Sequence, residues 1–94
     1  MKIDDLIASF EQKLKLQRYS PNSIKNYTSA VRSFLKVALK RFDNPGQLSE
    51  DEIEKYVLWK IEKHNVSSSY QRLIVASIDK FYQLVLNRNL QIRH

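Results

Sequence analysis

The sequence predicts an all-α fold, a compact bundle of four main helices over about 3–17, 21–41, 50–64 and 69–87. Apolar residues recur at three- and four-residue steps in four separate stretches, which is the spacing of one buried helix face. The chain of 94 residues contains only one Gly and two Pro, too few for the many tight turns of a sandwich or barrel. The short links favour neighbouring helices packed at substantial angles.

The first two helical stretches are the clearest. Asp4 and Asp5 near the start of the first, and lysines near its end, suit the helix dipole. In the second, Ser20 fits the N-cap and Pro21 the first helical position, where its missing N–H is not needed. The predicted buried positions are Ile3, Leu6, Ile7, Phe10 and Leu14 in the first stretch, and Ile24, Tyr27, Val31, Phe34, Leu35 and Ala38 in the second.

The third and fourth stretches follow clear breaks at Asp43-Asn44-Pro45-Gly46 and at residues 65–69. Ser49 and Glu52 have the spacing of a capping box. Any of the three serines 67–69 can cap the fourth helix. The predicted buried positions are Ile53, Tyr56, Val57 and Ile61 in the third stretch, and Tyr70, Ile74, Ile78, Phe81, Tyr82 and Val85 in the fourth, with Ser77 off that stripe.

Positive charge is concentrated in one part of the chain. Residues 12–42 contain eight Lys and Arg and no Asp or Glu, a local charge of +8 against +6 for the whole chain. A pI near 9.7 indicates a polyanion or an acidic protein as partner. The plainer interpretation is a solvated basic face on an ordinary core helix.

The sequence gives little support for an enzyme, a metal-binding protein or a membrane-spanning protein. There is no Cys, and His64 and His94 have no nearby ligand residues, so we expect no metal site and no cofactor. No nucleophile has an adjacent base, and one Gly cannot form a phosphate loop. No apolar run approaches a membrane span, and the first residues do not resemble a signal peptide, which favours a cytoplasmic protein.

Two polar helix starts, Tyr19–Lys25 and Ser67–Arg72, combine hydroxyl and amide side chains with cations. Lys and Arg neutralise phosphates, while Ser, Asn and free helix N–H groups donate short oriented hydrogen bonds. Asn and Gln can also read adenine in the major groove. We expect the two starts to lie on one side of the domain and together to hold duplex DNA.

The order of residues resembles the opening of the core-binding domain of tyrosine recombinases, the phage-integrase-like family. The resemblance rests on Leu14, Leu16, the run Tyr19–Tyr27, and Phe34 with Leu35. It continues in Val66–Gln71, in Ile78, Phe81 and Tyr82, and in the ending Leu86–Leu90. It covers about residues 4–90, and the order and spacing of these short motifs carry it.

The resemblance implies a SAM-like bundle that clamps DNA together with a larger catalytic domain, using its second and fourth helices. Its partners would be double-stranded DNA, the catalytic domain of the same chain and other recombinase protomers. The DNA-binding residues it implies are Ser20, Asn22, Ser23, Lys25, Asn26, Ser29 and Arg32 on the second helix, and Ser67, Ser68, Ser69, Gln71, Arg72 and Lys80 on the fourth.

Ser23 stands where the family more often has Thr, which keeps the hydroxyl, and Tyr70 stands where a small polar residue is usual. The family's catalytic residues belong to the other domain, so residues 1–94 are expected to form a single core-binding domain, an excised piece of a longer integrase that cannot cleave DNA by itself. The alternative is a helical protein-interaction module that binds an acidic partner.

Overall fold

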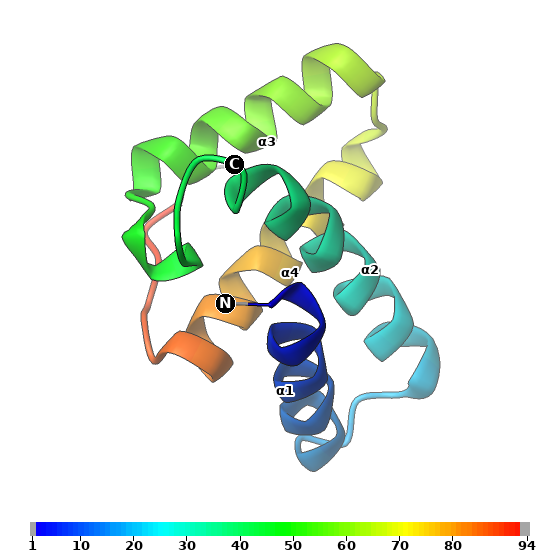
Figure 1. Ribbon diagram of the computed structural model, residues 1–94. Coiled ribbons are helices and arrows are strands. Elements are labelled where there is room, and N and C mark those ends of the chain that lie inside the picture. The colour runs from blue at the N-terminus through cyan, green and yellow to red at the C-terminus, as the bar shows by residue number, and fades with distance from the viewer. Residues whose placement is uncertain (1, 93–94) are drawn as a thin grey trace.

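The computed structural model describes residues 2–92, in the order α1 (Ile3–Leu16), α2 (Pro21–Ala38), the short 3₁₀ helix η1 (Pro45–Gln47), α3 (Glu50–His64) and α4 (Ser68–Leu86) (Figure 1). No strand occurs within these residues. The predicted all-α bundle of four main helices is therefore confirmed.

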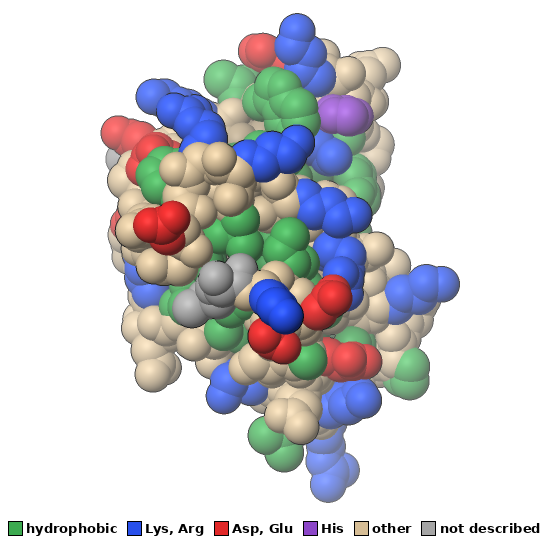
Figure 2. Space-filling view, viewed as in Figure 1, with side chains coloured by type: hydrophobic (Ala, Val, Ile, Leu, Met, Phe, Trp, Pro, Cys, Tyr) green, Lys and Arg blue, Asp and Glu red, His purple; other side chains and the backbone are tan. Residues whose placement is uncertain are grey.

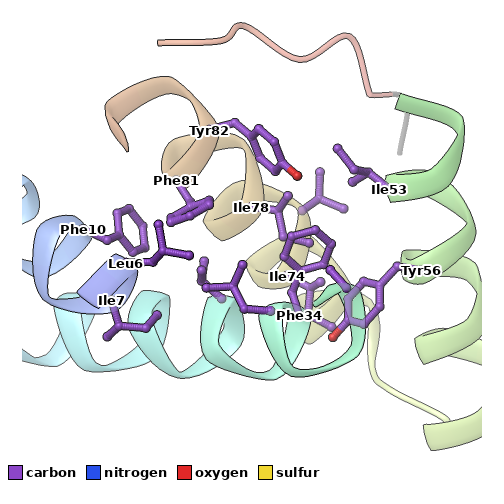
Figure 3. Close-up of a cluster of buried hydrophobic side chains, with 14 of the residues drawn as sticks. Leu6, Ile7, Phe10, Phe34, Ile53, Tyr56, Ile74, Ile78, Phe81 and Tyr82 are labelled. Carbon is purple, nitrogen blue, oxygen red and sulfur yellow. The ribbon is translucent and has the colours of Figure 1, made fainter. Parts of the chain in front are cut away.

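Helix α4 is central to the bundle. It contacts α1, α2 and α3, and α1 and α2 also pack against each other. The core is aromatic: the rings of Phe10 and Phe81 meet edge to face at 5.5 Å, and Phe34 lies 6.2 Å from Tyr82 (Figure 3). All four of these residues are fully buried. Edge-to-face packing of this kind adds to the stabilisation that burial of the ring area provides.

Helix ends depart from the prediction more than helix starts. Helix α2 ends at Ala38 rather than Arg41, because the Lys40 and Arg41 amides donate to the carbonyls of Val37 and Ala38, three residues back, and so tighten the turn. Helix α1 ends at Leu16 rather than residue 17. Helix α4 runs one residue earlier than predicted at both ends, from Ser68 to Leu86.

Several positions in α4 differ from the predicted stripe, among them Val75, which is buried outside it, and Val85, which is only partly buried. Ser77, predicted to lie off the stripe, is fully buried, and its hydroxyl donates to the Leu73 carbonyl one turn back. That bond satisfies the buried hydroxyl, so burial carries little penalty. Tyr70, predicted to be buried, is 40% exposed in the first turn.

The segment between α2 and α3 is held by the far end of α4. The buried Tyr82 hydroxyl donates to the Pro45 carbonyl at 2.5 Å. Arg88 donates to the Leu48 carbonyl at 2.6 Å and pairs with Glu50. Burial raises the pKa of Tyr82, so its hydroxyl stays protonated and remains a donor at neutral pH.

Replacing Tyr82 by Phe should lower the free energy of unfolding by about 0.5–1.5 kcal/mol, because the Pro45 carbonyl loses its hydrogen bond from the Tyr82 hydroxyl and keeps only that from the Leu48 amide. Urea unfolding followed by circular dichroism measures the change. Tyr70→Phe is the matched control, since the Tyr70 hydroxyl makes no protein hydrogen bond within residues 2–92. Equal stability of the two variants would contradict the role given to the Tyr82 hydroxyl.

Candidate nucleic-acid interface

The connection from α1 to α2 is a tight, hydrogen-bonded turn. The Tyr19 amide donates to the Leu14 carbonyl and the Arg18 amide to the Lys15 carbonyl, the pairing of a Schellman motif. Arg18 occupies the left-handed region, with φ 64°. This turn fixes the direction in which α2 leaves α1, and it leaves the Arg18 side chain exposed next to the start of α2.

Ser20 caps α2 as predicted. Its hydroxyl oxygen accepts the Ser23 amide at 3.2 Å, and Pro21 occupies the first helical turn. The Ser20 and Ser23 hydroxyls also lie 3.0 Å apart and share a hydrogen bond. In the first turn Pro21 has no N–H, so the Asn22 amide is the one left without a partner among the residues described, and together with the exposed Asn22 side chain it can donate hydrogen bonds to an anion.

An aromatic and cationic contact connects the start of α2 to the second half of α4. The Tyr19 ring packs against the Tyr27 ring at 5.6 Å, and the Lys80 ammonium lies 5.7 Å from the Tyr19 ring centroid. This cation–π geometry keeps the Lys80 charge beside the start of α2. The structure thus brings one predicted residue of α4 to the predicted residues of α2.

The outer face of α2 presents Lys25, Asn26 and Ser29, all exposed. Figure 2 shows Lys and Arg side chains spread along the course of α2, with acidic side chains near the start of α1 beside them. Arg32 is partly buried, and its guanidinium donates to the Asp4 carboxylate at 2.7 Å. Arg32 is therefore the one predicted cation of this helix that already has an anionic partner among the described residues.

The Arg32 hydrogen bond and positive charge lower the pKa of Asp4 below its usual value. A carboxyl with a lowered pKa stays ionised throughout the neutral range and is neutralised only in more acidic solution. The Asp4–Arg32 pair is therefore present at neutral pH, where any polyanion has to compete with Asp4 for the guanidinium.

Ser67 is the residue that caps α4. Its hydroxyl oxygen accepts the Tyr70 amide at 3.1 Å, which is why the helix begins at Ser68. Ser68, Ser69 and Arg72 are exposed, whereas Gln71 is partly buried. The predicted polar start of α4 therefore exists, and among residues 2–92 the side chains of Arg72, Ser68 and Ser69 have no salt-bridge or hydrogen-bond partner.

The starts of α2 and α4 are separate, although their helices pack together. Lys80, which contacts the turn before α2, lies about three turns, or roughly 18 Å, beyond Ser68 along α4. In Figure 1 the start of α2 is at the lower right and that of α4 at the upper right. The predicted residues therefore form two patches along the paired helices, with Lys80 beside the first.

The sequence patterns did not reveal the acidic neighbour of the basic face. Asp4 was explained as a favourable charge at a helix start, yet its carboxylate reaches across to α2. Lys36 is exposed on α2 and close enough to help lower the pKa of Asp4. Contacts of this kind join residues far apart in sequence, so helical periodicity carries no signal for them.

Within residues 2–92 there is no group of three or more His, Asp or Glu side chains arranged to hold a metal ion. No described helix is long and apolar enough to cross a membrane. The site offers cations, hydroxyls, amides and free helix N–H groups, which are groups able to bind and orient an anion.

The fold and this surface define a small all-helical domain with a basic, hydroxyl-rich face on two packed helices. A family model described as the N-terminal SAM-like domain of phage integrase matches residues 6–92. The match spans nearly the whole chain, so the chain belongs to this family of phage-integrase N-terminal SAM-like domains. No curated protein and no solved structure gave a significant match.

Replacing Ser20 by Ala should lower the free energy of unfolding by about 1 kcal/mol, because the Ser23 amide loses its cap. Ser29→Ala, on the exposed middle of the same helix, should leave stability unchanged or raise it by a few tenths of a kcal/mol. Thermal or urea unfolding of the two variants makes the comparison. A larger loss for Ser29→Ala would contradict the assigned cap.

Proposed function

We propose that the chain is the DNA-binding, core-binding domain of a tyrosine recombinase and that it holds duplex DNA through α2 and α4 in support of DNA integration or recombination. Membership of the phage-integrase family supports this function. In the whole protein, its partners would be double-stranded DNA, a catalytic domain of the same chain and other recombinase protomers. The cleavage chemistry would belong to that catalytic domain, and the protein would act in the cytoplasm.

The observation that carries the proposal is the acid-free basic run of residues 12–42, which contains the capped start of α2. Lys25 is exposed one turn into the helix, and Lys80 is held beside the same start by Tyr19. Point charges next to oriented hydroxyls and amides suit a phosphate backbone. The second patch, Ser67–Arg72, would meet the same duplex further along its axis.

The double substitution of Lys25 and Arg32 by Glu should abolish duplex binding at near-physiological salt. Wild-type affinity is expected at roughly 10⁻⁴–10⁻⁶ M, falling by about 0.9 log unit per log unit of salt for each phosphate contact. Fluorescence anisotropy with a labelled duplex at several salt concentrations measures both quantities. Lys55→Glu with Lys60→Glu on α3 makes the same charge change away from the proposed face, and an equal loss there would contradict the assignment.

Replacing Asp4 by Ala should raise duplex affinity, because it frees Arg32 from its carboxylate partner. Asp5→Ala removes the same charge from the next, exposed position, so the general electrostatic effect is common to both variants. The difference between the duplex affinities of the two variants therefore measures the effect of releasing Arg32. If duplex affinity rises equally for the two variants in anisotropy titrations, Arg32 makes no phosphate contact.

A further inference from the structure

We propose that a groove between α2 and α3 docks a large apolar side chain from an acidic amphipathic helix of a partner protein. The groove has a volume of about 350 Å³. This is at the small end of ligand sites, roughly 300–1,000 Å³, so it suits one anchoring side chain better than an extended small molecule. Its apolar lining includes Phe34, Val37, Leu48, Tyr56 and Trp59.

The apolar wall of the groove reaches solvent. Trp59 is 39% exposed and Val37 is 36% exposed, although each stands on a helix with an otherwise normal buried stripe. Trp59 is supported on its own helix by Tyr56, at 5.8 Å, and by the edge of His64, at 5.2 Å. A supported aromatic ring beside a cavity is a typical anchor point for a partner side chain.

The charge at the rim selects an acidic partner. Arg41 and Lys55 line the groove, and neither forms a salt bridge with any of the residues described. Glu52 also lines it and keeps its negative charge, although its carboxylate is turned to the Ser49 amide and hydroxyl of the capping box. Two cations and one carboxylate leave the charged lining of the groove with a net charge of +1.

Tyr56 lines the groove as a neutral, largely buried side chain. Burial raises the pKa of Tyr56 to about 12, so the hydroxyl stays protonated at neutral pH. An apolar floor between two helices, with the cations Arg41 and Lys55 in its lining, matches the helix-in-groove mode of recognition.

Trp59 is the only tryptophan of the chain, so its fluorescence reports directly on the groove. The probe is a synthetic helical peptide without Trp, with Leu at three- and four-residue steps and Glu and Ala elsewhere. This peptide is expected to cause a saturable change in Trp59 emission. The change should be lost when the leucines of the peptide are replaced by Ala, and also when its glutamates are replaced by Lys. No saturable change with the acidic Leu peptide would overturn the proposal.

Val37→Glu should abolish peptide binding, because it places a carboxylate in the groove wall. Leu58→Glu is the control, since Leu58 is 55% exposed beside Trp59 but does not line the groove. Circular dichroism checks that both variants fold. Equal loss of peptide binding in both variants would overturn the proposal.

A second outcome would also overturn it: a Trp59 response to a short oligothymidylate or duplex, with no response to the peptide. Duplex binding is tested separately with the double substitution of Lys25 and Arg32 by Glu, so a negative result in one experiment does not decide the other proposal.

Discussion

The packing of α2 against α4 is the constraint on which the rest of the structure depends. Phe34 and Tyr82 meet across this contact, and small residues, Ala30 and Ser77, are also buried in the two helices. Helices α1 and α3 each contact α4, so both rely on its position. Successive helical residues differ by about 100° around the axis. The buried stripe of α2 therefore also determines which of its polar side chains face outward.

One helix consequently serves several purposes. The N-terminal half of α2 carries the cap and Lys25, while its C-terminal end forms a wall of the groove at Val37. Lys25 and Val37 are roughly 18 Å apart along the helix axis. That separation allows the proposed duplex surface and the proposed protein-docking groove to occupy the same rigid element without sharing a residue.

Local signals in the sequence were sufficient for the fold and for the helix starts. Ser20 and Ser49 were predicted as caps from side-chain chemistry alone, and both accept the expected amide. The end of α2 was harder, because its final turn tightens through backbone bonds that many sequences can form. The Asp4–Arg32 pair and the Arg88 contacts join residues distant in sequence, which periodicity cannot anticipate. The DNA-binding roles of the predicted site residues stay predictions.

The acidic residues, as well as the basic ones, determine from which side a polyanion can approach the domain. Glu50, Asp51 and Glu52 gather at the start of α3, and Asp4 and Asp5 at the start of α1, where each set favours its helix dipole. The same charges repel phosphate from those two ends of the molecule. Residues 12–42 contain no acid, so α2 itself adds no repulsion, but the Asp4 carboxylate stands against it at Arg32. The acid at the start of α1 therefore stabilises its own helix and at the same time limits how far along α2 an anion could approach.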